Sequence, residues 1–113
     1  MDLSKLPPPA TQSGLTYDKD VKPILEKSCL KCHSGDKPKA KYLIGTRQGM
    51  IKGGDSGEAA IVPGQSAKSP LIHYVSGAVK DMEMPPLDKR DKFPELTREQ
   101  IGLLRAWIDQ GAK

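Results

Sequence analysis

The chain of 113 residues is long enough for one domain and too short for two ordinary cores. Its apolar fraction is 36% and its aromatic fraction only 4%, so a core built from side chains alone would be thin. The net charge of +4 is scattered rather than gathered in blocks, which argues against a nucleic-acid-binding patch, and no apolar run is long enough to span a membrane.

Residues 1–15 are proline-rich and polar and show no periodicity. The run Pro7-Pro8-Pro9 favours polyproline II geometry, so we expect an extended N-terminal arm or linker. Residues 16–113 would then form the single domain. Across the chain, 11 glycines and 10 prolines predict long loops between short helices.

The first helix is predicted to begin between Thr16 and Asp20 and to run into the next motif. Pro23 fits only in its first turn, where the missing N–H is not needed. Four residues recur at helical spacing on one face. They are Val21, Ile24, Leu25 and Ser28.

The stretch Cys29-Leu30-Lys31-Cys32-His33 has the pattern of a c-type haem attachment site. Two thiols three positions apart lie on one face of a helical turn, where each can form a thioether with one haem vinyl group. His33 then reaches one axial face of the iron as the proximal ligand. We therefore expect one covalently attached haem c, held by Cys29 and Cys32, around which the thin core packs.

Three other interpretations of these cysteines are weaker. A tetrahedral zinc site would have only Cys29, Cys32, the adjoining His33 and the distant His73 as ligands. A thioredoxin-like redox pair would need a βαβ context, which the flanking sequence lacks. A disulfide between positions three apart is sterically poor. Haem attachment is favoured over all three.

The middle of the chain is predicted to be mostly loop. Residues 34–41 form an exposed loop, and Tyr42-Leu43-Ile44 is a short apolar segment expected to pack on the haem. A brief helix over 46–51 ends at Gly53-Gly54, which suits a left-handed cap. Another loop spans residues 55–68.

A third helix is predicted over residues 70–76, with Ser69 as N-cap and Pro70 as its first residue. Its inward residues are Leu71, Ile72 and Val75. Residues 81–94 form a long irregular stretch.

The last helix has the clearest signals. Thr97 and Gln100 form a capping box, and Gly111 is placed as the stop. Its apolar stripe is Ile101, Leu104 and Ile108, flanked by Leu103 and Trp107.

The second axial ligand of the iron is predicted to be Met84. Pro85 and Pro86 follow it directly and fix the backbone beside the thioether. Met82, two positions earlier, is the fallback. Met50 fits core packing. His73 would give bis-histidine ligation instead, or would lie near a haem propionate and make the reduction potential pH-dependent.

These motifs together resemble the planctomycete-type cytochrome c domain, a class I-like c-type cytochrome family, over nearly everything from residue 17 onward. The matching stretches are Asp20 to Leu25, Cys29 to His33, Gly53 to Gly57, Ile61 to Gly64 with Ser69-Pro70-Leu71, Met84-Pro85-Pro86, Leu96-Thr97, and Trp107 to Ala112.

The resemblance implies an all-α, small cytochrome c fold of about four short helices and long Gly/Pro-rich loops wrapped around one haem. It implies that Cys29 and Cys32 bind haem, that His33 is the proximal ligand and that Met84 is the distal ligand. It also implies that the first and last helices cross beside the haem, so that Trp107 packs against Val21, Ile24 and Leu25.

The expected function is electron transfer by a low-spin, six-coordinate haem rather than enzyme catalysis. One alternative is a haem sensor or peroxidase-like enzyme with a labile Met84. Another is an electron-relay module of a larger oxidoreductase.

We expect a monomer that meets redox partner proteins through a small, transient interface at the exposed haem edge near Cys32, Ser34 and Gly35. Haem is attached to such motifs outside the cytoplasm. We therefore expect a periplasmic or otherwise exported protein, whose export signal would precede Met1.

Overall fold

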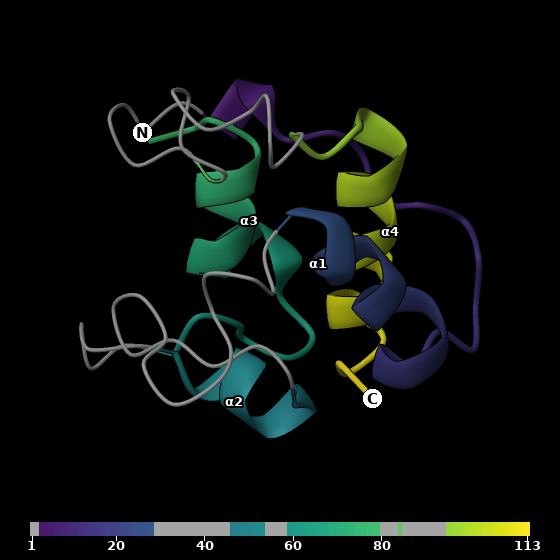
Figure 1. Cartoon of the computed structure of the whole chain (residues 1–113). Coiled ribbons are helices and arrows are strands. Elements are labelled where there is room, and N and C mark those ends of the chain that lie inside the picture. The colour runs from purple at the N-terminus through teal and green to yellow at the C-terminus, as the bar shows by residue number, and fades with distance from the viewer. Residues whose placement is uncertain (1–2, 29–45, 54–58, 80–83, 85–94) are drawn as a thin grey trace.

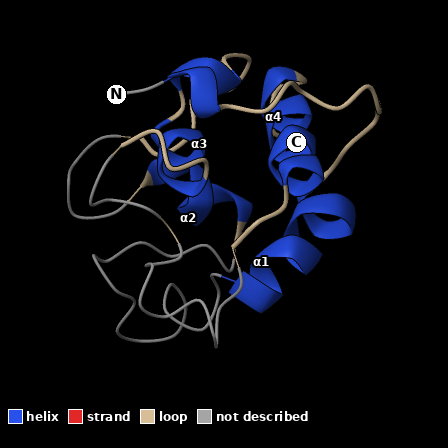
Figure 2. Ribbon diagram, turned by 90° about the horizontal axis from the view of Figure 1, so that it is seen from above, coloured by secondary structure: helices blue, strands red, loops and turns tan. Residues whose placement is uncertain are grey.

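The computed structural model describes residues 3–28, 46–53, 59–79, 84 and 95–113. Within these ranges every regular element is a helix, and no strand is present (Figure 2). The principal helices are α1 (Lys22–Ser28), α2 (Arg47–Lys52), α3 (Pro70–Val75) and α4 (Arg98–Asp109), and Figure 1 shows their arrangement. The predicted all-α class with about four short helices is confirmed.

The N-terminal helix consists of two joined parts, the π-helical turn η2 (Tyr17–Val21) and α1. The helix begins within the predicted range, and the Thr16 hydroxyl caps its start by accepting a hydrogen bond from the Lys19 N–H at 3.4 Å. Pro23 is the second residue of α1 but the seventh of the joined helix, so it lies beyond the first turn in which it was predicted. The π geometry just before Pro23 was not predicted from the sequence.

Helix α2 begins and ends as its sequence indicates. The Thr46 hydroxyl accepts from the Gly49 N–H at 3.1 Å. Gly53 closes the helix with a φ of 92°, a value that residues with a Cβ rarely adopt.

Helix α3 follows a short 3₁₀ turn, η4 (Ser66–Lys68). Ser69 occupies the N-cap position of α3, but its side chain makes no capping bond. Its hydroxyl instead accepts from the Val62 N–H at 2.9 Å and donates to the Gln65 carbonyl at 3.1 Å. Ser69 therefore fastens the preceding loop rather than the helix it precedes.

Helix α4 has the predicted capping box. The Thr97 hydroxyl accepts from the Gln100 N–H at 3.1 Å, and the Gln100 side chain accepts from the Thr97 N–H at 2.9 Å. At the other end, Gly111 has a φ of 106° and the Ala112 N–H donates to the Trp107 carbonyl. The Ala112 carbonyl accepts from Arg47 Nε, which ties the C-terminus to α2.

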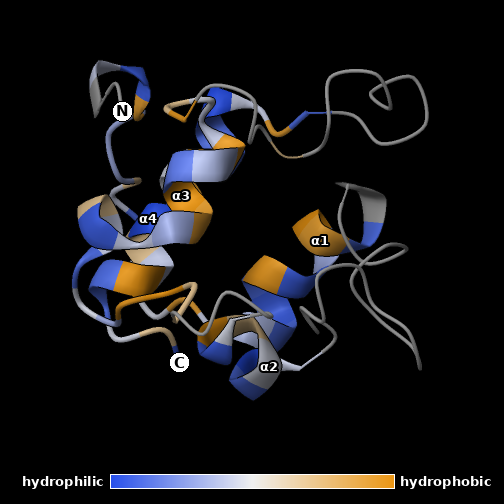
Figure 3. Cartoon of the chain, turned by 90° about the vertical axis from the view of Figure 1, so that its left-hand side faces the viewer, coloured by the Kyte–Doolittle hydropathy of each residue, from blue (hydrophilic) through white to orange (hydrophobic). Residues whose placement is uncertain are grey.

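One hydrophobic core joins η2, α1, α2, α3 and α4. Its fully buried side chains include Val21, Leu25, Met50, Ile61, Ile72, Leu104, Trp107 and Ile108. Figure 3 shows hydrophobic bands on α1 and α3 that alternate with hydrophilic ones, as expected for helices buried on one side. The predicted inward residues of α3 and the stripe of α4 are all buried.

The N-terminal residues 3–15 run past α4 (Figure 1), to which the part from Pro7 onward is hydrogen-bonded. They form one 3₁₀ turn (Leu3–Lys5) and then continue without regular structure to Thr16. Pro7 and Leu15 are buried. The predicted domain boundary after residue 15 stays a prediction.

Candidate haem site

Helix α1 delivers the chain to the attachment motif. It ends at Ser28, directly before Cys29 in the sequence. Val21 and Leu25 anchor its inner face in the core, with exposed fractions of 0% and 1%. Cys29, Cys32, His33 and the fallback ligand Met82 lie outside the described residues, as do the predicted loop over 34–41 and the segment Tyr42-Leu43-Ile44.

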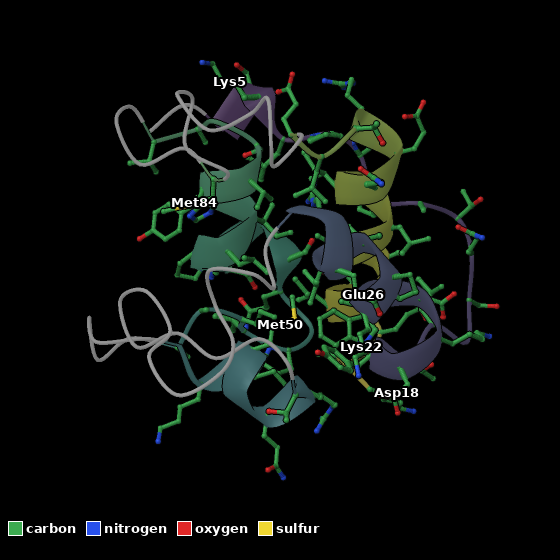
Figure 4. All side chains as sticks on the ribbon, in the orientation of Figure 1. Lys5, Asp18, Lys22, Glu26, Met50 and Met84 are labelled. Carbon is green, nitrogen blue, oxygen red and sulfur yellow. The ribbon has the colours of Figure 1, made fainter. Side chains whose placement is uncertain are left out.

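Met84 is held at the C-terminal end of α3. Its backbone N–H donates to the Tyr74 carbonyl at 3.0 Å. Gly77, with a φ of 77°, lies in the turn that ends α3. Met84 is half-buried and packs against the hydrophobic core, beside α3 in Figure 4. Because Pro85 follows, the Met84 backbone is restricted to extended conformations.

Met50 has a different environment from Met84. It is 0% exposed and lies among the core side chains, between α2 and the other helices (Figure 4). This position agrees with the packing role predicted for it from the sequence.

His73 is engaged by a backbone group. Its Nε2 lies 2.7 Å from the Ala67 carbonyl oxygen, so the ring donates its Nε2–H to that oxygen. An iron bond through Nε2 would require this hydrogen bond to be broken. The geometry therefore favours a structural role for His73 over bis-histidine ligation.

An aromatic pair joins η2 to α4. The rings of Tyr17 and Trp107 have centroids 6.3 Å apart and an interplanar angle of 47°. Burial raises the pKa of the Tyr17 phenol above its usual value of 10.0, and the nearby carboxylates of Asp18 and Glu26 raise it further. Asp18, Lys22 and Glu26 lie in a row along η2 and α1 (Figure 4).

Tyr17 was missed in the sequence analysis, although a signal was present. It lies four residues before Val21 and eight before Leu25, so extending the apolar stripe backwards would have included it. Its ring gives Trp107 an aromatic partner that the resemblance alone did not name.

The Trp107 indole is fully buried, and its Nε1–H has no acceptor among the described residues. A buried donor of this kind is costly unless it is satisfied. It is therefore available to an acceptor on a bound group. The sequence adds two thiols and an imidazole in the attachment motif and the thioether of Met84, and these residue types fit a covalently bound haem.

Two other classes of feature were sought in the described part of the chain. No group of three or more His, Cys, Asp or Glu side chains is placed to hold a metal ion there. None of the helices in that part is long and apolar enough to cross a membrane.

The comparisons with known proteins agree with the motif. Residues 29–88, more than half of the chain, match the family described as Planctomycete cytochrome C. No curated protein and no solved structure matches the chain. The matched segment begins at the first cysteine of the attachment motif and includes α2, α3 and Met84. The chain belongs to the planctomycete cytochrome c family, and that membership implies covalent haem c and haem-based electron transfer.

Proposed function

We propose that the protein is a monohaem electron carrier with His33 and Met84 as the two axial ligands of a low-spin, six-coordinate iron. One observation carries the choice of Met84. Its backbone N–H is hydrogen-bonded to the Tyr74 carbonyl at the end of α3 and two prolines follow it in the sequence, so the thioether starts from a defined point beside α3.

The residues have separate roles in this proposal. Cys29 and Cys32 form the thioethers that fasten the cofactor, and His33 binds one axial face of the iron. Met84 binds the other face and excludes added ligands. The haem supplies one-electron redox chemistry at a potential that a thioether ligand raises.

The same proposal places the protein in a wider context. Residues 16–113 are the cytochrome domain, carrying one haem, and the protein acts as a monomer in the periplasm or another exported compartment. Its partners are redox proteins that dock through a small interface at the haem edge, where brief contact suffices for electron transfer.

The optical spectrum of the haem-loaded protein tests this proposal directly. In the ferric form we expect the weak Met–Fe(III) charge-transfer band. After dithionite reduction we expect sharp c-type bands that added CO leaves unchanged. A CO-shifted spectrum would instead indicate an open or labile sixth position, as in a haem sensor or peroxidase-like enzyme. Absence of covalently bound haem after expression with the attachment machinery would contradict the proposal as a whole.

The methionines provide matched variants. Met84→Leu conserves volume but removes the thioether, so it should abolish the charge-transfer band and allow CO to bind. Met50→Leu makes the same chemical change in the core and should leave both properties intact. Met82→Leu tests the fallback. Loss of the band in that variant, with Met84→Leu unaffected, would move the ligand by two residues.

A further inference from the structure

The contacts between residues 7–15 and α4 are specific rather than incidental. The Ala10 N–H donates to the Gly102 carbonyl at 2.9 Å, in the middle of α4. Arg105 Nη1 donates to the Pro7 carbonyl at 2.6 Å, and Gln110 Nε2 donates to the Gln12 carbonyl at 2.6 Å. The same Gln110 side chain accepts from the Leu15 N–H at 3.3 Å.

Gly102 has a structural reason to be glycine. A Cβ at this position would lie 2.7 Å from the Pro8 carbonyl oxygen and 3.6 Å from the Ala10 nitrogen. The first distance is shorter than real Cβ contacts allow, and the atom it meets is backbone. Glycine is a poor helix former, so its presence inside α4 is explained by the close approach of the arm.

Each of these hydrogen bonds uses a backbone atom of the arm. The α4 side contributes two long polar side chains, one carbonyl and a position without a side chain. Such a surface recognises an extended main chain, which proline favours because its φ is already fixed. Pro7 and Leu15 add apolar burial near either end of the contact.

We infer that the outer face of α4, formed by Gly102, Arg105 and Gln110, is a recognition site for an extended proline-containing segment, and that residues 7–15 of the same chain are its ligand. The docked segment acts as a strap. Its last residue, Leu15, is hydrogen-bonded to Gln110 and directly precedes Thr16, the cap of η2. The strap therefore holds η2 against α4, beside the Tyr17–Trp107 pair.

Arg105 also couples the strap to the rest of the fold. Its Nε donates to the Ser66 hydroxyl at 3.0 Å, and Ser66 is bonded in turn to both carboxylate oxygens of Asp109. The bond to Ser66 orients the Arg105 guanidinium independently of the arm. Less side-chain entropy is therefore lost when Arg105 binds the Pro7 carbonyl.

The strap is tested in the full chain by two changes, one on each side of the contact. Gly102→Ala improves helix propensity but places a methyl group against the Pro8 carbonyl. Ala10→Pro removes the N–H that binds Gly102 and leaves α4 unaltered. Glu99→Ala, at an exposed position of the same helix, is the control.

The readout is hydrogen exchange of the Leu15 amide, which does not depend on the haem. Both strap variants should speed this exchange about tenfold or more, and Glu99→Ala should not change it. Unchanged or slower exchange in Ala10→Pro would overturn the inference, and so would slower exchange in Gly102→Ala. If Gly102→Ala does not fold, Ala10→Pro decides the question alone.

Light scattering measures the oligomeric state and so tests whether residues 7–15 bind α4 of their own chain or of a second copy. The wild-type protein should be monomeric, with Leu15 exchange independent of protein concentration. A dimer whose Leu15 protection grows with concentration would mean that the arm binds a second copy, and it would overturn the assignment to its own chain.

Discussion

Helix α4 and the Met84 end of α3 are held in contrasting ways. Helix α4 is contacted from several sides. The arm, Ser66 in η4 and the Gly64 N–H form hydrogen bonds with it, and Tyr17 in η2 packs on its Trp107 ring. Met84 is joined to α3 by one backbone hydrogen bond and is half-buried. The contrast indicates a firmly packed scaffold on the α4 side and a lightly held Met84, the axial ligand proposed above.

Trp107→Ala is expected to have the largest effect on this scaffold. The indole is 0% exposed and packs against Tyr17, so its removal should lower the free energy of unfolding by about 3–5 kcal/mol. Denaturant unfolding measures the loss. Leu103→Ala, on the same helix but only partly buried, should cost clearly less. Equal losses in the two variants would show that α4 is not anchored through Trp107.

Ser66→Ala should have an intermediate effect. The buried hydroxyl donates to Asp109 and accepts from Arg105, so its loss leaves both partners under-satisfied at a cost of about 1–3 kcal/mol. Ser76→Ala is the control, because that hydroxyl makes one longer bond, to the His73 carbonyl. If Ser66→Ala lowers the free energy of unfolding no more than Ser76→Ala does, the Ser66 hydrogen bonds do not stabilise α4.

His73→Ala examines the lightly held side. It removes one hydrogen bond, to the Ala67 carbonyl, from a half-exposed side chain, so the expected loss is about 1 kcal/mol or less. The charge-transfer band of the ferric protein should persist. Loss of the band would show that the His73 side chain is essential to iron ligation, which would contradict the structural role assigned to it.

Tyr17 should make the stability of the protein depend on pH, but only at alkaline pH. Its pKa is raised in the folded protein, chiefly by burial, so above pH 10 the unfolded chain loses a proton that the folded chain retains. Stability is therefore fully present below that pH and falls as the pH rises beyond it. Urea midpoints between pH 8 and 11 should decline less steeply in Tyr17→Phe. An identical decline in both proteins would contradict the burial of an un-ionised phenol.

Much of the fold could be predicted because its signals are local. Thr97 caps α4 as expected, the helices that Thr16 and Thr46 cap begin where they were predicted to begin, and the apolar stripe of α4 is buried. Each of these depends on residues within one or two turns of the helix concerned. The attachment motif is likewise local and by itself indicated a covalent haem, whereas the family was indicated by this motif together with the others along the chain.

The rest could not be predicted because it depends on distant partners. Ser69 has the sequence of an N-cap, but Val62 and Gln65 compete for its hydroxyl once the loop folds back. The arm has no periodicity, and its ordering depends on Gly102, about ninety residues later. The axial role of Met84 stays a prediction, supported by its backbone hydrogen bond to the end of α3.

The π turn at Tyr17–Val21 has a consequence for helical phase. In an α-helix, residues four apart overshoot a full turn by about 40°, whereas a π turn holds more residues and a step of four falls short of one. The step from Tyr17 to Val21 crosses the π turn and falls short of a full turn, whereas the step from Val21 to Leu25 runs along α1 and exceeds one. The two angular deviations therefore have opposite signs. All three side chains are consequently buried on the inner face of the joined helix. A purely α-helical step from Tyr17 to Val21 at the same length would turn the Tyr17 ring away from this face, so the π turn keeps that ring beside Trp107.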